Sequence, residues 1–324
     1  MEEITLVKRL IASTKSDILK FSAADLKESI LASEGRVIMG QHLVMINTGL
    51  VDGVTNAEIQ AAYGADMVML NGFDMIKEES NIGLREMKHG KLAEKPYSLK
   101  QVKEWAGVPL GIYFECPSPD AQVAGEQYVE AKEGRVASRE NFLRALEIGA
   151  DFIVLGGNPS AGTTFERIIE ATKLAKETLG DKILICAGKW EDGTIEKVLG
   201  DPLSERPSNE IIKDLIDSGA DVITLPAPGS RHGITVEHVR QCVEFVHSYK
   251  PGTLALSFLN SSVEGADIQT IAWIALMMKQ TGADIHAIGD GGYAGTPLPE
   301  NVYQLALSIK GRRHTIKRMV GRSR

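Results

Sequence analysis

The sequence predicts an α/β protein built as one (β/α)8 barrel, and three observations lead to that prediction. The tripeptide Gly-Ala-Asp occurs four times, each time between a segment with helical spacing of apolar residues and a four-residue apolar run. These runs do not alternate with polar residues, which is typical of parallel strands buried on both faces. Four further apolar segments fit between the joints, so that eight strands alternate with helices from residue 36 to residue 309.

The four Gly-Ala-Asp joints place every second strand. A glycine directly after a helix suits the left-handed backbone that commonly ends helices. The apolar runs that follow the joints occupy 67–70, 152–155, 222–225 and 285–288, and the segments that complete the eight are 36–40, 109–114, 182–186 and 253–257. A doubly wound open sheet is the alternative fold. It usually carries a glycine-rich dinucleotide-binding turn after its first strand, and residues 39–43 do not form one.

Two additions flank the barrel of residues 36–309. Residues 1–35 are a predicted helical extension that closes the barrel floor or contacts another subunit. Residues 310–324 are a short basic tail with seven lysines and arginines and no acidic residue, so the rest of the chain is more acidic than the net charge of −7 suggests. The polar stretch 115–137, between the third strand and its helix, is a candidate lid.

Composition narrows the class of protein. The chain has 324 residues, 43% hydrophobic residues and only 3 cysteines, which indicates a globular protein without a disulfide framework and favours the cytoplasm. Residues 1–20 lack the apolar core of a secretory signal, and the longest apolar run, 271–278, is too short to span a bilayer. The acidic net charge makes nucleic acid an unexpected partner. We expect a small phosphorylated metabolite as the partner, no membrane, and a homo-oligomer.

Barrel chemistry resides at the carboxyl ends of the strands, because only the loops there vary without disturbing the packed interior. In this sequence those ends carry many proton donors and acceptors. They show no tightly spaced metal-binding motif. We therefore predict no cofactor, with a divalent metal such as Mg²⁺ kept as an alternative.

A glycine-rich loop follows the eighth strand at residues 288–296. Its glycines let backbone amides converge on an anion, and a helical turn starting near Gly292 would add a positive dipole end. Together with residues 257–262 after the seventh strand, this loop resembles the phosphate cradle of the phosphate-binding TIM-barrel superfamily, which includes sugar-phosphate epimerases, aldolases and synthases. The resemblance implies phosphate contacts from Ser261, Gly291, Gly292 and Gly295. Tight-turn glycines without a ligand are the alternative interpretation.

Three residues are candidates for catalysis. Glu115 comes directly off an apolar strand, so its carboxylate is expected to face the barrel mouth as a general base, a metal ligand or a structural partner of a cation. Lys189 follows the fifth strand and could form a Schiff base with a carbonyl substrate or stabilise an enolate; a lysine paired with Glu191 or Asp192 is the alternative. His42 is the candidate auxiliary acid, with a packing role as its alternative.

Four more side chains are candidates for substrate binding. Asn71 suits the recognition of a substrate hydroxyl, and Asn158 lies in a second glycine-rich loop that could hold a carboxylate or phosphate. Arg231 follows a proline-rich loop that could bring its guanidinium onto an anion. Asp290 follows the eighth strand.

These residues predict an enzyme that acts on a small phosphorylated carbonyl or sugar compound. It would abstract a proton next to a carbonyl, as an isomerase, an epimerase or an aldolase-type lyase. One alternative is a metal-assisted enzyme that uses Asp74, Glu115 and Asp290 on a phospho- or carboxylate substrate. Another is a barrel that binds a phosphate ligand without catalysis.

Overall fold

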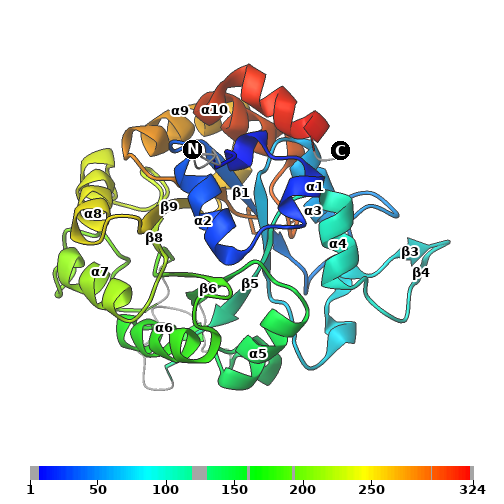
Figure 1. Ribbon diagram of the computed structural model, residues 1–324, viewed down its shortest axis with the longest axis horizontal. Coiled ribbons are helices and arrows are strands. Elements are labelled where there is room, and N and C mark those ends of the chain that lie inside the picture. The colour runs from blue at the N-terminus through cyan, green and yellow to red at the C-terminus, as the bar shows by residue number, and fades with distance from the viewer. Residues whose placement is uncertain (1–6, 119–129, 159–160, 192–193, 293, 322–324) are drawn as a thin grey trace, which may run out of the picture.

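The computed structural model describes residues 7–118, 130–158, 161–191, 194–292 and 294–321. Eight parallel strands close into a barrel in the order β1-β10-β9-β8-β7-β6-β5-β2, and helices surround it (Figure 1). The (β/α)8 fold predicted from the sequence is therefore confirmed. The barrel strands are β1 (Val37–Leu43), β2 (Met67–Asn71), β5 (Leu110–Glu115), β6 (Phe152–Gly156), β7 (Leu184–Gly188), β8 (Val222–Pro226), β9 (Leu254–Leu259) and β10 (Ile285–Ile288).

The helices between the strands form the outer ring. They are α3 (Asn56–Ala62), α4 (Leu99–Ala106), α5 (Arg139–Glu147), α6 (Phe165–Leu179), α7 (Ser208–Asp217), α8 (Val236–Tyr249), α9 (Ile268–Gln280) and α10 (Pro299–Gly321). The strands after the Gly-Ala-Asp joints begin where the sequence predicts. The other four start one or two residues later than predicted and run further toward their carboxyl ends, which places more of the polar residues there inside a strand.

Alternate residues of each strand face two different cores. Val37, Met39 and Met69 belong to the cluster inside the barrel, whereas Ile38 and Leu70 belong to the cluster between barrel and helices. Because side chains in a strand point alternately to opposite faces, this register decides which residues at the strand ends reach the mouth of the barrel.

The amino-terminal extension closes the barrel at the end opposite its carboxyl edge. It contains η1 (Leu10–Ala12), α1 (Lys15–Ile18) and α2 (Ala23–Leu31), and α2 lies over the near end of the barrel in Figure 1. Apolar side chains of all three helices join the inner core, namely Leu10, Ile11, Ile18, Leu26 and Ile30. They bury apolar surface that open strand ends would leave in water.

The basic residues after the barrel belong to a helix and not to a separate tail. α10 continues to Gly321, with a break at Gly311, where φ is 75°. Two of its cations turn inward: Lys310 Nζ lies 2.6 Å from Asp66 Oδ2, and Arg318 Nε lies 3.7 Å from Asp66 Oδ1, with no solvent exposure of these side chains. Arg322 and Arg324 lie outside the described residues.

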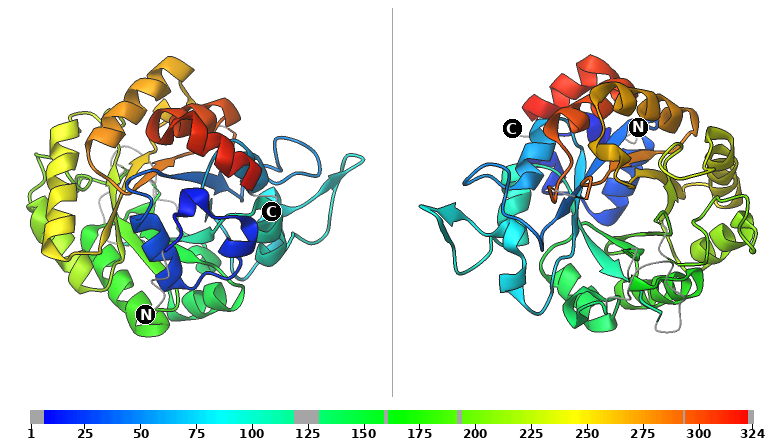
Figure 2. Two further views of the ribbon diagram at one scale, coloured as in Figure 1. Left: turned by 45° about the horizontal axis from the view of Figure 1, so that its top comes forward. Right: turned by 180° about the vertical axis from the view of Figure 1, so that it is seen from behind.

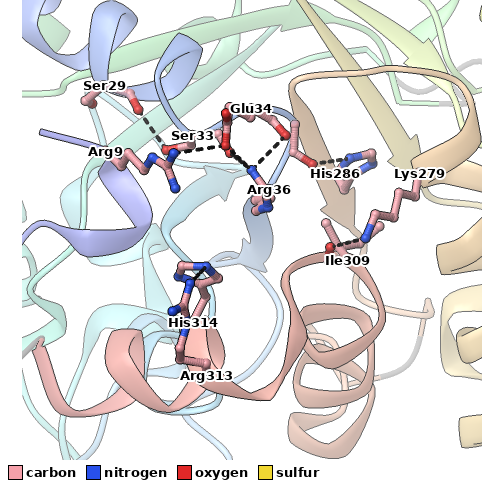
Figure 3. Close-up of polar contacts among 11 residues, drawn as sticks. Arg9, Ser29, Ser33, Glu34, Arg36, Lys279, His286, Ile309, Arg313 and His314 are labelled. Carbon is pink, nitrogen blue, oxygen red and sulfur yellow. Dashed lines mark hydrogen bonds and ion pairs between the residues drawn. The ribbon is translucent and has the colours of Figure 1, made fainter. Parts of the chain in front are cut away.

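The same end of the molecule carries an exposed polar cluster, drawn in Figure 3. Glu34 pairs with both Arg9, at 3.1 Å, and Arg36. His286 points out of the barrel from β10, and its Nε2 lies 3.2 Å from the carbonyl oxygen of Gly35. Burial lowers the pKa of His286 to about 4, so this imidazole is a neutral packing group far from the carboxyl edge.

Each Gly-Ala-Asp aspartate clamps the strand before it at two points. Asp66 donates its backbone N–H to the carbonyl of Ile38 (2.7 Å) and accepts the N–H of Ile38 on Oδ2 (2.9 Å). The same pair of bonds joins Asp151 to Leu110, Asp221 to Ile185 and Asp284 to Ala255. The repeat in the sequence therefore corresponds to a repeated hydrogen-bond geometry that fixes strand register at the amino-terminal end of the barrel.

Two features of the loops were not predicted. A short antiparallel hairpin of β3 (Met87–Lys88) and β4 (Lys91–Leu92) projects from the loop between β2 and α4 (Figure 1). In the stretch predicted as a lid, residues 119–129 lie outside the described residues, and 133–135 form a 3-10 turn. No helix in the described part of the chain is long and apolar enough to span a membrane.

Candidate active site

The carboxyl edge of the barrel collects polar side chains that continue the inward-facing rows of the strands. Gln41 comes two residues after Met39, Asn71 after Met69, and Glu115 after Tyr113, and each of these predecessors belongs to the inner core. Because the period of a strand is two residues, all three side chains point into the mouth. The sequence prediction that Glu115 faces the mouth agrees with this placement. The right-hand view of Figure 2 shows the molecule from the side opposite α2.

Glu115 is held by a relay of two asparagines. The backbone N–H of Asn158 donates to Glu115 Oε2 at 2.9 Å, and the Asn158 side-chain amide donates to Oε1. The carbonyl oxygen of that amide accepts from Asn71 Nδ2 at 3.3 Å. The structure therefore brings three of the predicted site residues together, from β2, β5 and the loop after β6.

The Glu115 carboxyl is poised to exchange a proton near neutrality. Burial raises its pKa to about 7, against the opposing effects of the two Asn158 hydrogen bonds and of the nearby Arg135 guanidinium. A carboxylate with a pKa near the working pH combines a large ionised fraction with useful basicity.

Glu191 is a second carboxyl of this kind, which was expected from the sequence only as a partner for Lys189. It accepts from Asn260 Nδ2 at 2.5 Å. Glu191 keeps some contact with solvent, but burial of its carboxyl raises its pKa to about 8. The Arg231 guanidinium opposes this shift. The negative charges of Glu115, Glu264 and Asp290 add to it. Strand periodicity could not have located Glu191, because β7 ends at Gly188.

Aromatic rings form the floor beneath these carboxyls. The rings of Tyr113 and Trp190 meet edge to face with centroids 5.9 Å apart, and those of Trp190 and Phe258 lie 5.1 Å apart. The Tyr113 hydroxyl and Trp190 Nε1 are buried and have no hydrogen-bond partner among the described residues. Such a floor lowers the local dielectric response, which strengthens the electrostatic interactions above it.

Arg231 and Asp290 also reach the mouth, as predicted. The Arg231 guanidinium donates to the carbonyl oxygens of Trp190 at 3.3 Å and Asn260 at 3.1 Å. Asp290 Oδ1 accepts from Gln41 Nε2 at 3.0 Å. Burial raises the pKa of Asp290. Hydrogen bonds from its own backbone amide, the Gly292 amide and the Gln41 side chain oppose this shift.

Lys189 does not converge with Glu115, which corrects the sequence prediction. Lys189 directly follows β7, which ends at Gly188, and its side chain turns into the loop after that strand. Its Nζ donates to Thr194 Oγ1 and to the carbonyl oxygen of Glu196, both at 2.7 Å, and pairs with Glu196 Oε2 at 3.0 Å. The lysine thus stabilises the loop after β7.

His42 lies outside the mouth because of its position within β1. Gln41 points inward, so its neighbour points outward, against Gly83. Burial lowers the pKa of His42 to about 3, and neither ring nitrogen has a hydrogen-bond partner among the described residues. A neutral imidazole on the outer face of β1 is not placed to act as an acid beside Glu115.

Two of the backbone amides predicted to hold phosphate, those of Ser261 and Gly291, are bonded to one of the protein's own carboxylates. Ser261 N–H donates to Glu264 Oε2 at 2.8 Å, and Gly291 N–H donates to Glu264 Oε1 at 3.2 Å. The carbonyl oxygen of Gly295 accepts from Leu43. The structure shows no helical turn at Gly292; Tyr293 lies outside the described residues. The bond from Ser261 to Glu264 spans three residues, the Ser-x-x-Glu spacing of a capping box, so this signal was present in the sequence and was missed. The bond from Gly291 to Glu264 depends on the tertiary structure.

A model of a protein family described as a domain of unknown function (DUF7916) matches residues 11–324. The chain belongs to this family. A comparison with curated proteins gives no match. In this family member the matched region includes the whole barrel and every candidate residue described above.

Solved structures share the fold of this DUF7916 member at low identity. The carboxyl transferase domain of Rhizobium etli pyruvate carboxylase, solved with pyruvate and biocytin, has a TM-score of 0.52 and 12% identity, covering 94% of this chain and 52% of that one. A second structure of that domain has a TM-score of 0.51 and 12% identity, covering 95% of this chain and 52% of that one. A candidate lyase/mutase from Burkholderia cenocepacia J2315 has a TM-score of 0.49 and 14% identity, covering 86% of this chain and 84% of that one. The chain spans about half the length of the carboxyl transferase chains, and this likeness concerns the fold alone.

Asp74, one of the three carboxylates of the metal-assisted alternative, is engaged away from the mouth of this DUF7916 barrel. Asp74 Oδ1 accepts the backbone N–H groups of Ile76 and Lys77, and its Oδ2 lies 3.9 Å from Arg135 Nε. In the part of the chain that the structure describes, no three His, Cys, Asp or Glu side chains are grouped so that they could hold a metal ion.

Proposed function

We propose that this protein is an enzyme that moves a proton next to the carbonyl of a small substrate, with Glu115 as the base and Glu191 as the acid. The observation that carries the proposal is the pair itself: two carboxyls at one barrel mouth, with pKa values raised to about 7 and about 8. Pairs of titratable groups whose environments separate their pKa values are a recurrent basis for acid and base roles.

The chemistry follows from the two protonation states. Ionised Glu115 takes the proton from the carbon beside the carbonyl, and that C–H bond's electrons form the new C=C bond. Protonated Glu191 gives its proton to the carbonyl oxygen, so that an enediol forms without a free enolate charge. An isomerase returns the proton to the former carbonyl carbon, while the hydroxyl on the deprotonated carbon loses its proton and becomes the new carbonyl. An epimerase returns the proton to the carbon that lost it, on the opposite face of the enediol. In an aldolase-type lyase the base instead takes the proton of the hydroxyl one carbon further from the carbonyl. A new carbonyl forms at that carbon, the C–C bond breaks, and its electrons form the C=C bond of the enediol.

Three parts of the sequence prediction do not enter this mechanism. Lys189 is held by the loop after β7, so the proposal involves no Schiff base. His42 lies outside the mouth, so Glu191 replaces it as the acid. The phosphate group loses its support because Glu264 takes the amides of Ser261 and Gly291. That contact also weakens the alternative of a barrel that only binds phosphate.

The test is proton exchange from heavy water. The protein is incubated with dihydroxyacetone, fructose, amino sugars and the phosphate esters of these ketoses, and deuterium at the carbon beside the carbonyl is measured by NMR. We expect exchange with at least one compound, and a fall of about 10²- to 10⁴-fold in Glu115→Gln and in Glu191→Gln.

Glu237→Gln is the matched control, since that glutamate lies on the exposed face of α8. It should leave exchange unchanged. Exchange that persists in Glu115→Gln at the rate of the control contradicts the assignment of the base, and absence of exchange with every compound contradicts the proposed reaction.

A further inference from the structure

We infer that the mouth binds the non-reacting end of its substrate through hydroxyl or ammonium groups that donate hydrogen bonds, and not through a phosphate. The inference rests on the proposed function for the position of the reacting end. It names the class of substrate: a polyhydroxy or amino carbonyl compound without a phosphate at this end.

Three buried acceptors lack a donor. Gln41 Oε1, Asn71 Oδ1 and Asp290 Oδ2 have no hydrogen-bond partner among the described residues, and the three residues are 2%, 3% and 7% exposed. They come from β1, β2 and the end of β10, which are adjacent in the barrel. Buried polar atoms are normally satisfied, so three neighbouring acceptors without donors indicate a ligand that supplies N–H or O–H groups.

The orientation of both amides is fixed by carboxylates, which shows that the free atoms are acceptors. Gln41 directs its NH₂ at Asp290 Oδ1, which leaves Oε1 toward the mouth. The Asn158 amide directs its NH₂ at Glu115, so its oxygen must face Asn71. Asn71 then donates to that oxygen and leaves its own Oδ1 free.

The same region has neutral donors that are unpaired among the described residues, namely the Tyr113 hydroxyl, Trp190 Nε1 and the Ser261 hydroxyl, but its negative charge disfavours an anion. Four carboxyl groups gather there, those of Glu115, Glu191, Glu264 and Asp290, since each influences the titration of Glu191. The amides of Ser261 and Gly291 are bonded to Glu264. A phosphate would have to displace this carboxylate and then lie among the others, whereas an ammonium or hydroxyl group meets acceptors directly.

The test uses two matched sets of non-reacting probes. One set is glycerol, 3-amino-1,2-propanediol and glycerol 3-phosphate; the other is sorbitol, its 6-amino-6-deoxy derivative and sorbitol 6-phosphate. Within a set only one end group differs. Titration calorimetry on the full chain should show tighter binding of the hydroxyl and ammonium members than of the phosphate member, by about tenfold or more for the ammonium.

Two variants locate the binding group. Asp290→Asn should abolish the preference for the ammonium member, and Asn71→Leu should weaken the hydroxyl member about tenfold. Asp52→Asn, at an exposed aspartate, is the matched control and should change neither. Thermal unfolding checks that each variant is folded. Because the variants remove acceptors on different strands, an unfolded Asp290→Asn leaves Asn71→Leu as an independent test.

Three results overturn the inference: a phosphate member that binds at least as tightly as its partners, affinities unchanged in both site variants, or no measurable binding by any of the six probes. These results are separable from the proposed reaction, because the probes have no carbonyl. Probe binding without deuterium exchange would refute the reaction and keep the binding mode. Deuterium exchange with phosphorylated ketoses only would support the reaction and refute the binding mode.

Discussion

Asp66 and Lys310, at opposite ends of the chain, form an ion pair of 2.6 Å from which solvent is excluded completely. Lys310 Nζ also donates to the carbonyl oxygen of Gly64, and Asp66 Oδ2 accepts the backbone N–H of Ile38. Through this pair the carboxyl-terminal helix is attached to the joint between α3 and β2. The contact explains why basic residues follow the barrel: at least one of them neutralises a buried carboxylate.

Lys310→Met should therefore destabilise the fold strongly. The substitution removes the nearer of the two cations beside buried Asp66 and leaves only Arg318, whose Nε lies 3.7 Å from Asp66 Oδ1. Loss of one partner of a buried ion pair costs about 3–5 kcal/mol of unfolding free energy, and the remaining arginine places the expected loss at the lower end of that range. Urea denaturation measures the change. Lys317→Met, on the exposed side of the same helix, should change the free energy by less than about 0.5 kcal/mol. Equal losses in the two variants would contradict the role given to the buried pair.

The clamp made by the Gly-Ala-Asp aspartates gives a second prediction. Asp151→Ala removes the acceptor for the backbone N–H of Leu110 and the partner of Lys103, 2.6 Å away, and should cost about 2 kcal/mol. Asp151→Asn keeps an acceptor and should cost less. Asp181→Ala is the control, since its carboxylate is 93% exposed. Denaturant midpoints that rank the three variants differently would refute the clamp.

The position of Lys189 predicts the outcome of chemical trapping. Schiff-base formation needs a neutral amine beside the substrate. The Lys189 ammonium is instead bonded to Thr194 and Glu196 and lies 5.6 Å from the centre of the Phe165 ring. Borohydride reduction in the presence of any carbonyl compound that supports exchange should leave the peptide containing Lys189 unmodified by mass spectrometry. A reduced adduct on that lysine would restore the Schiff-base mechanism.

The repeat in the sequence was sufficient for the fold. Each Gly-Ala-Asp performs a local task, ending a helix at a glycine with positive φ and clamping a strand through the aspartate, and four copies of that task require four pairs of strands. Such local rules are legible in a single sequence. The orientation of Glu115 was predicted correctly because a polar residue at the end of an apolar strand has few other places to go.

The parts of the site that could not be predicted depend on parity and on loops. The strand that contains His42 carries apolar residues on both faces, so nothing in the sequence shows which face His42 joins. Lys189 lies just past the end of β7, in a loop whose path the sequence does not show. Glu191 and Glu264 lie beyond the ends of β7 and β9, where strand periodicity no longer applies. Glu264 also reverses the interpretation of the glycine-rich loop, since amides that suit an anion already hold one.

The paired carboxyls predict a bell-shaped dependence of the exchange rate on pH. Below about pH 7 Glu115 is protonated and cannot accept the substrate proton, so the rate should rise with pH through that value. Above about pH 8 Glu191 has lost the proton it donates, so the rate should fall.

In Glu191→Gln the alkaline limb should disappear, because the group that titrates there is absent, while the acid limb remains at a lower rate. Glu237→Gln should keep both limbs. Because Glu191 is still protonated and uncharged at the pH where Glu115 titrates, replacing it by glutamine should leave the acid limb near pH 7. An alkaline limb that survives in Glu191→Gln would assign the donated proton to another group.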